Sequence, residues 1–199
     1  MSNSTEVFNE ISRKLSRETN LQNQLAIVVE GAMDLTNADA GTLYSISDDK
    51  FLKFEVVLNR SLEIKKQAPD MSFPDIPLYL ENKEENSSMV VVNCVLTEQS
   101  IFIDNAYDEQ DYNLSGVRKF DESTGYRTYS LLTVPIFDFA KKIIGVIQLI
   151  NAKDPDDSMR VFNKNDQEMV NLFVLQTAFT LSSKILIDKQ KALFKTIND

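Results

Sequence analysis

The sequence contains no histidine and only one cysteine, Cys94. The absence of histidine excludes the Ser-His-Asp and Cys-His catalytic arrangements and every histidine-based metal site. A lone cysteine cannot form an intramolecular disulfide, a thiolate zinc site or an iron–sulfur cluster, and its scarcity fits a reducing compartment. Because so much enzyme chemistry is excluded, we expect neither a catalytic domain nor a metal site in this chain.

Basic residues and long apolar runs are also scarce. The 21 Lys and Arg residues are outnumbered by 30 Asp and Glu residues, which gives a formal net charge of −9. A general nucleic-acid binder needs a positive surface, and so does a protein that docks on anionic lipid. No stretch approaches the ~18 apolar residues of a membrane span, and the N-terminus lacks a secretory signal pattern. We therefore expect a cytoplasmic protein that binds neither nucleic acid nor membrane.

The chain has 199 residues, of which 43% are hydrophobic, so it can form one domain with flanking helices. Apolar residues recur at helical spacing over residues 6–36. The polar SRETN segment predicts a break there, with Thr19 or Asn20 as the N-cap of a second helix. A long helix is predicted from residue 162 to the C-terminal end.

The long C-terminal helix has two candidate N-cap residues, Asn163 and Asn165. Strands are predicted in the middle of the chain. Residues 40–46 and 51–58 alternate in polarity and predict an antiparallel hairpin. Residues 130–137 and 142–151 are apolar at nearly every position, which is typical of central strands covered on both faces.

The other segments give weaker signals. A short strand is expected at residues 101–103. Residues 59–77 carry three prolines and are predicted as loop or sheet edge. Residues 108–128 and 151–160 are predicted as loops. This order of elements predicts an α+β fold in which one antiparallel sheet has helices on one side.

Several segments in the right order resemble the GAF domain family. They are TNADAGTLY (36–44), FEVVLNRSL (54–62), IDNAY (103–107), FDESTGYRTYSLLTVPI (120–136) and IIGVIQLINAKD (143–154). The resemblance implies a PAS-like, six-stranded antiparallel sheet with flanking N- and C-terminal helices and a ligand pocket roofed by loops and short helices. It also implies a helix at residues 87–96, where the β-branched residues alone favour a strand.

The resemblance divides the chain into three parts. Residues 1–20 form an N-terminal helix, residues 21–182 the GAF domain, and residues 183–199 a C-terminal signalling or dimerisation helix. The segments are most similar to GAF domains of cyclic-nucleotide phosphodiesterases and of bacterial proteins with an HD-type phosphodiesterase. That catalytic unit needs several histidines, so we do not expect it in this chain.

The resemblance also implies a ligand site. The residues that correspond to the pocket of cyclic-nucleotide GAF domains are Ser45, Asn59, Ala106, Thr124, Tyr126, Thr128 and Gln148. Ala106 would lie at a helix start, where the N-terminus attracts a phosphate, and Ser45 and Asn59 would lie near the same mouth. The ring of Tyr126 and the threonine hydroxyls suit a purine.

The alternative is that the loop that carries Thr124, Tyr126 and Thr128 has a structural role. Asp121 would then cap a turn, Arg127 would pair with an acid, and the threonines would satisfy the loop backbone. Cys94 lies among valines and is expected to be a small buried hydrophobe and not a reactive thiol or chromophore attachment point.

The family's cyclic-nucleotide signature is N-K, a spacer, and F-x-x-x-D-E. Four residues correspond to it: Asn151, Lys153, Phe162 and Asp166. The lysine comes one residue late, and Gln167 replaces the glutamate. A one-residue shift turns a side chain to the other side of a strand, which puts the family's lysine–aspartate brace and cyclic-nucleotide binding in question. The alternative is that Lys153 and Asp166 form an ordinary surface pair.

The function implied by the resemblance is regulatory. We expect a domain that senses a small molecule, with cyclic GMP or cyclic AMP as the leading ligand, and controls a phosphodiesterase or cyclase attached in cis or bound in trans. The narrow apolar seam of the last helix predicts a homodimer through the terminal helices. The alternative function is a dimerisation or scaffold GAF module with no functional ligand pocket.

Overall fold

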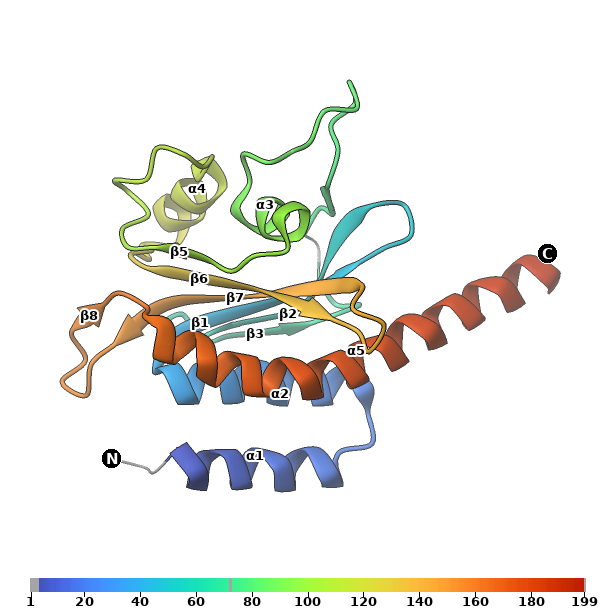
Figure 1. The fold of residues 1–199 in the computed structure, drawn as a ribbon, viewed down its shortest axis with the longest axis horizontal. Helices are drawn as coiled ribbons and strands as arrows, with labels where there is room; N and C mark the ends of the chain where they lie inside the picture. Colours follow the sequence, from blue (N-terminus) through green and yellow to red (C-terminus); the bar gives the residue numbers. More distant parts are fainter. Residues whose placement is uncertain (1–3, 72, 199) are drawn as a thin grey trace.

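The computed structural model describes residues 4–71 and 73–198 and has one antiparallel sheet with helices on both faces (Figure 1). Six strands follow the order β3-β2-β1-β7-β6-β5. They are β1 (Ala38–Ile46), β2 (Phe51–Asn59), β3 (Ile64–Gln67), β5 (Ile101–Ile103), β6 (Leu131–Phe137) and β7 (Ile143–Lys153). The predicted six-stranded antiparallel sheet is confirmed, and two short strands, β4 (Ile76–Pro77) and β8 (Met159–Arg160), extend it.

Helices lie on both faces of the sheet (Figure 1). The helices are α1 (Ser4–Arg17), α2 (Leu21–Thr36), α3 (Val90–Thr97), α4 (Ser115–Thr124) and α5 (Lys164–Asn198). Helices α2 and α5 pack directly on the sheet, with α1 outside α2, whereas α3 and α4 lie across the opposite face. The expectation of helices on one side alone is therefore wrong, and the arrangement implied by the GAF resemblance is found.

Asparagine side chains set the starts of the long helices. The side chain of Asn20 accepts hydrogen bonds from the amides of Gln22 and Asn23, at 2.9 and 3.1 Å, so Asn20 is the N-cap of α2. The side chain of Asn163 accepts from the amides two and three residues further on, and α5 accordingly begins at Lys164. Each cap satisfies amides that have no partner within the helix.

Helix α3 forms despite its β-branched sequence because burial outweighs intrinsic propensity. Val91, Val92, Cys94 and Val95 are buried in one cluster with Tyr44 and other residues of the sheet. Helical spacing is what brings these side chains to a common face. The helix implied by the GAF resemblance is confirmed, and the strand favoured by propensity is not found.

Two segments, residues 108–128 and 151–160, differ from the sequence prediction, and a third agrees with one of its alternatives. Residues 108–128 contain α4 and are not a continuous loop. The helix ends at Gly125, whose φ of 73° suits glycine and whose amide donates to the carbonyl of Asp121 at 2.8 Å. Residues 151–160 contain the end of β7 and all of β8. Residues 59–77 contain the edge strand β3, as the edge alternative predicted.

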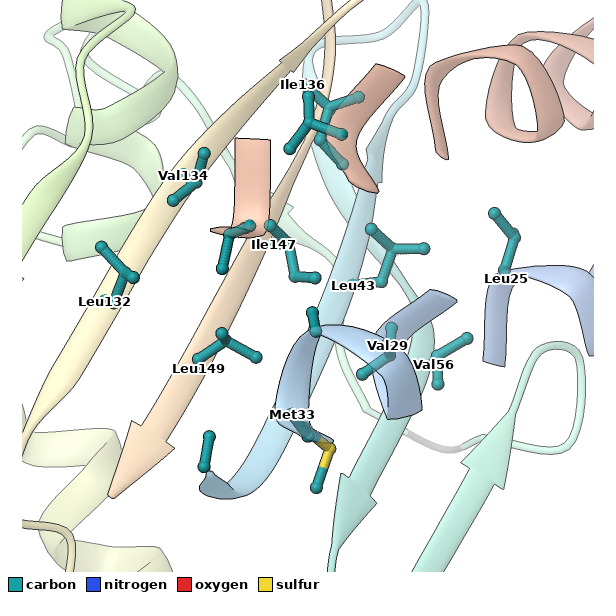
Figure 2. Packing of buried hydrophobic residues seen from close by; sticks show 14 of the residues in the cluster. Leu25, Val29, Met33, Leu43, Val56, Leu132, Val134, Ile136, Ile147 and Leu149 are labelled. Carbon is teal, nitrogen blue, oxygen red and sulfur yellow. The ribbon is translucent and has the colours of Figure 1, made fainter. Parts of the chain in front are cut away.

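The main core lies between the sheet and helices α2 and α5 (Figure 2). Leu43 of β1 and Ile147 and Leu149 of β7 are almost fully buried there. Helix α2 approaches β1 so closely that a Cβ on Gly41 would lie 2.7 Å from Cγ1 of Val29. Because side chains alternate along a strand, the residues between these core positions point to the face that α3 and α4 cover.

Helix α5 has two arms, Lys164–Leu175 and Thr177–Phe194, which meet at a bend of 43°. The second arm projects beyond the sheet (Figure 1). No single helix among the described residues is both long and apolar enough to cross a membrane, although the two arms of α5 reach that threshold when taken together.

Candidate functional site

A buried polar network lies where β1 begins and β7 ends, and its centre is Tyr126. The phenol of Tyr126 donates to Oδ2 of Asp39 at 2.7 Å and accepts from Nδ2 of Asn151 at 3.0 Å. Asn151 has a left-handed backbone, with φ of 58°. Its Nδ2 also donates to the carbonyl of Arg127, and its Oδ1 accepts from the amide of Tyr129. Asn151 therefore fastens the segment between α4 and β6 to the sheet.

Asp39 joins Lys153 to this network. Nζ of Lys153 lies 3.1 Å from Asp39 and 3.1 Å from Asp157, and the hydroxyl of Ser61 donates to Asp39 at 2.8 Å. Burial acts to raise the pKa of Asp39, but the hydrogen bonds from Tyr126 and Ser61, together with Lys153, lower it overall. Burial, reinforced by the neighbouring Asp39, raises the pKa of Tyr126. The phenol is thus held neutral and the carboxylate charged.

Asp166 is braced by Arg160 and not by Lys153. The Arg160 guanidinium donates to both carboxylate oxygens of Asp166, at 2.7 and 2.9 Å, and also to the carbonyl of Thr36 at 2.8 Å. The hydrogen bond with Asp166 raises the pKa of Arg160. The pair therefore ties β8 to the start of α5 and the end of α2. The alternative of a surface pair between Lys153 and Asp166 is wrong, since each has another partner and neither is exposed.

Phe162, the remaining residue of the signature, is buried in the core between the sheet and the helices. It therefore anchors the segment that leads into α5. Its place in the core is a packing role and says nothing about a ligand.

A second buried carboxylate, Asp121 of α4, organises the loop that follows. It accepts hydrogen bonds from the amide and the hydroxyl of Thr128, at 2.8 and 2.9 Å, and from the phenol of Tyr107 at 3.1 Å. The guanidinium of Arg127 lies 3.3 Å from the centre of the Tyr107 ring, so Arg127 stacks on an aromatic face. The hydroxyl of Thr128 is thus engaged inside the protein.

Two further residues of the predicted pocket also make local bonds. The hydroxyl of Thr124 donates to the carbonyl of Phe120 at 2.7 Å. The amide of Ala106 donates to the carbonyl of Tyr129 at 2.7 Å, within a turn held by Asn105. The expected helix start at Ala106 is therefore wrong, because the Asn105 side chain folds this segment into a single turn.

Ser45 and Asn59 do not lie near the same pocket opening. Ser45 lies near the far end of β1 and donates to Glu55 at 2.6 Å on the side where Lys184 of α5 reaches the same carboxylate. Asn59 pairs with Ala40 near the start of β1 and accepts from a loop amide. That expectation is wrong because the register of the β1–β2 hairpin places the two residues at opposite ends.

Gln148 belongs to a polar stripe across the centre of the sheet. Thr42 of β1, Gln148 of β7 and Thr133 of β6 are direct cross-strand neighbours. Their neighbours along each strand point into the core with α2 and α5, so the stripe faces α3 and α4. Gln148 donates to the hydroxyl of Thr133 at 3.0 Å. Thr42 and Thr133 are buried, whereas Gln148 keeps partial exposure.

Three surface hollows are formed by described residues, and they lie elsewhere. One lies between the end of β6 and the first arm of α5, one beside Arg60, and one between the β1–β2 hairpin and the second arm of α5. Asn59 lines the second hollow and Ser45 the third. The remaining predicted pocket residues line none of these three.

The structure gathers some predicted residues and adds others. Asn59, Tyr126, Asn151 and Lys153 meet at one end of the sheet, and Gln148 lies at its centre. The residues that sequence reasoning did not assign are Thr42, Thr133, Asp39 and Arg160. A charge within a strand of apolar residues, as at Asp39, is a signal that a buried partner exists, but it does not identify that partner.

Comparisons with known proteins place this geometry in a family. A family model described as the GAF domain matches residues 20–181. A stretch of 108 residues is 28% identical to the dual 3′,5′-cyclic-AMP and -GMP phosphodiesterase 11A of Takifugu rubripes, and it covers 51% of this chain but only 11% of that protein.

Solved structures agree on the fold. The GAF domain of an Acinetobacter phosphoenolpyruvate-protein phosphotransferase superposes with a TM-score of 0.68 at 14% identity, covering 95% of this chain and 99% of that one. The phycoerythrobilin-bound GAF domain of a cyanobacterial phytochrome gives a TM-score of 0.55 at 12% identity, covering 94% and 99%. At such low identities the likeness concerns the fold alone.

Proposed function

Because the chain belongs to the GAF domain family, typically a small-molecule-sensing regulatory module, we propose that it binds its ligand over the sheet face beneath α3 and α4. The observation that carries this proposal is the polar stripe of Thr42, Gln148 and Thr133. The stripe interrupts a sheet face on which other buried residues, such as Tyr44 and Val146, are in an apolar cluster with α3. Buried polar groups weaken a fold unless they are bonded, and a ligand can supply such bonds.

The chemistry of the stripe suits a nucleobase. The amide of Gln148 presents both a donor and an acceptor, and hydroxyls flank it on each side. At one end of β1 and β7, the ring of Phe120 packs edge-on against Tyr126, with centroids 6.3 Å apart and planes at 73°, so the two rings contact each other. The amide and the hydroxyls of the stripe are therefore the groups that would meet the polar edge of a flat heterocycle. Cyclic GMP or cyclic AMP is therefore our leading ligand, a choice that the phosphodiesterase relative supports.

A hydrogen-bonded route links this region to α5. Asn151 holds the segment that carries Tyr126, and it also accepts a hydrogen bond from the amide of Ser130 at 3.3 Å. The hydroxyl of Ser130 donates to the carbonyl of Arg160, whose guanidinium holds Asp166 in the first turn of α5. A ligand with different affinity for two packings of this segment would shift the position of α5 and so regulate a phosphodiesterase or cyclase in cis or in trans.

The second candidate function is a scaffold module without a functional pocket. It is favoured by the hydroxyls of Tyr126 and Thr128, which are already bonded to Asp39 and Asp121. A ligand that used these hydroxyls would have to break buried bonds. The two functions differ in one measurable respect, which is whether any small molecule stabilises the folded protein.

The test is ligand-dependent unfolding. A ligand at ~100 times its dissociation constant should raise the free energy of unfolding by ~2.7 kcal/mol. We expect cyclic GMP or cyclic AMP to do so, and Gln148→Leu to abolish the shift while the protein stays folded. Gln99→Leu, at an exposed position in the α3–β5 connection, is the matched control and should leave the shift unchanged.

Two outcomes would contradict the proposal. No shift with either cyclic nucleotide would remove the proposed ligand and favour the scaffold function. An equal shift in the wild-type protein and in Gln148→Leu would place the ligand away from the polar stripe.

A further inference from the structure

Two arginines share one aromatic ring beside α4. The guanidinium carbon of Arg127 lies 3.3 Å from the centre of the Tyr107 ring, and that of Arg118 lies 5.8 Å from the same centre. Both arginines are exposed, whereas Tyr107 is half-buried. The face of an aromatic ring attracts cations, so Tyr107 keeps the two guanidinium groups near each other. We name these three residues the arginine site.

Both guanidinium groups lack an anionic partner in the described part of the chain, although acidic residues outnumber basic ones, 30 to 21. Glu122 lies one helical turn beyond Arg118 on α4 but forms no ion pair with it. Asp121 is 3% exposed and accepts hydrogen bonds from Tyr107 and Thr128, so its carboxylate is engaged inside the protein. Two guanidinium groups near one ring repel each other, and an anion that contacts both would offset this repulsion.

The arginine site lies next to the polar stripe, on the sheet face that α4 covers (Figure 1). Tyr107 packs in one cluster with Leu131 and Ile150. Ile150 follows Gln148 by two residues on β7, and its neighbour Leu131 precedes Thr133 by two residues on β6. Residues two apart on a strand point to the same face and lie about 7 Å from each other. This spacing is comparable with the separation of the base and the phosphate within one nucleotide.

The backbone beside the arginine site has no free amides for a phosphate. The amide of Ala106 donates to the carbonyl of Tyr129 at 2.7 Å, and the amide of Tyr107 donates to Oδ1 of Asn105 at 3.1 Å. Because these amides are already bonded, a phosphate at this place needs side-chain donors. Arginine suits this task, since its planar fork of N–H groups matches two phosphate oxygens at once.

On the basis of the function proposed above, we propose that Arg118 and Arg127 bind the phosphate group of a nucleotide whose base lies on the polar stripe. Arg118 belongs to α4, and Arg127 belongs to the segment between α4 and β6 that also carries Tyr126. A phosphate that contacts both arginines joins this segment to the helix. The bound ligand would thereby hold α4 over the sheet.

The experiment compares each cyclic nucleotide with its nucleoside, which has the same base but no phosphate. Cyclic GMP, guanosine, cyclic AMP and adenosine are titrated into the purified chain by calorimetry at constant ionic strength. We expect the wild-type protein to bind one cyclic nucleotide at least about tenfold more tightly than the corresponding nucleoside, which is the value of one hydrogen bond to a charged group. Arg118→Gln and Arg127→Gln should each remove most of this preference and leave the affinity for the nucleoside unchanged.

Lys119→Gln is the matched control, because Lys119 is an exposed cation next to Arg118 on α4 and lies outside the arginine site. It removes the same charge and should keep the preference. Each variant must also keep the wild-type unfolding transition, which the exposure of the three substituted residues leads us to expect.

Three outcomes would overturn the inference and leave the proposed ligand site on the stripe intact. The first is equal affinity of the wild-type protein for the cyclic nucleotide and its nucleoside. The second is a preference that survives in both arginine variants. The third is a preference that Lys119→Gln reduces as strongly as the arginine variants do, because the effect would then be one of net charge.

Failure of the proposed function itself has a different signature, in which neither the cyclic nucleotides nor the nucleosides bind. The arginine site is then judged with inorganic phosphate at millimolar concentration, against chloride at the same ionic strength. Saturable changes in the amide NMR signals of Tyr107, Arg118 and Arg127, absent in Arg127→Gln, would support a phosphate site that takes the free anion. Unchanged signals would overturn the inference.

Discussion

The ion pair between Arg160 and Asp166 allows a sharp test of how α5 is attached to the sheet. Asp166→Asn keeps the size of the side chain and removes the charge that receives both guanidinium bonds. Breaking a buried ion pair costs about 3–5 kcal/mol. Because the Arg160 side chain keeps 22% exposure, water relieves part of this cost. We expect the free energy of unfolding to fall by about 3 kcal/mol.

The assay is urea unfolding followed by circular dichroism, with thermal unfolding alongside. For a domain of this size, a loss of about 3 kcal/mol corresponds to a fall of about 6–12 °C in Tm. Arg160→Lys should lose less stability than Asp166→Asn, because lysine keeps the charge but cannot donate to both carboxylate oxygens at once. A loss below about 1 kcal/mol in Asp166→Asn would refute the reasoning, since it is the value of an exposed pair.

Double-mutant cycles then identify the partner of Asp166. Arg160→Met combined with Asp166→Asn should show a coupling energy above about 1 kcal/mol, because the two side chains are in direct contact. Lys153→Met combined with Asp166→Asn should be additive within about 0.5 kcal/mol, since Lys153 binds Asp39 and Asp157 instead. Strong coupling in the second cycle would restore the lysine–aspartate brace of the cyclic-nucleotide family.

Two further predictions concern buried titratable groups. Because the pKa of Asp39 is lowered in the folded protein, the ionised carboxylate contributes to the free energy of unfolding. This contribution is complete above the unfolded pKa of about 4 and is lost as the pH falls through the folded pKa. The stability difference between wild type and Asp39→Asn should therefore be constant from about pH 5 to 8 and shrink as the pH falls below about 4; a difference that does not change with pH in acid would contradict this. Burial raises the pKa of Cys94 to about 12, so a thiol reagent at neutral pH should modify the unfolded chain only, and rapid modification of the native protein would show that α3 opens.

The strongest elements could be predicted because their signals are local. The apolar runs of β6 and β7 and the N-caps Asn20 and Asn163 each depend on residues within a few positions of one another. The identity of the family was also readable, because several motifs occur in order. In each case the sequence pattern and the tertiary environment favour the same structure.

Helix α4 was missed because its stability comes from distant contacts. Its sequence, SGVRKFDEST, has few apolar residues and no acid in the first turn. What holds it is Asp121, which is 3% exposed and bonded to Thr128 and Tyr107. A carboxylate surrounded by polar residues reads as a solvated loop, and only the folded chain shows the partners that make its burial tolerable.

The candidate site could be predicted only as a region. The motif indicated the loop that carries Tyr126. It did not indicate that Asp39, 87 positions earlier in the chain, accepts the hydrogen bond from the Tyr126 hydroxyl. Likewise Arg160 gave no sign that it would replace Lys153 as the partner of Asp166. Pairings between remote side chains depend on strand register and on local backbone conformation, such as the left-handed backbone at Asn151, which one sequence does not reveal.

The two outer strands of the sheet affect how this protein behaves at high concentration. An exposed strand edge offers unpaired amides and carbonyls on which another chain can extend the sheet, and such growth has no natural end point. Here β5 has three residues, and β3 has four, two of which are Lys65 and Lys66. Both edge strands are thus too short or too charged for another chain to extend the sheet. Concentrated solutions should resist fibril formation, and self-association should stop at small closed assemblies.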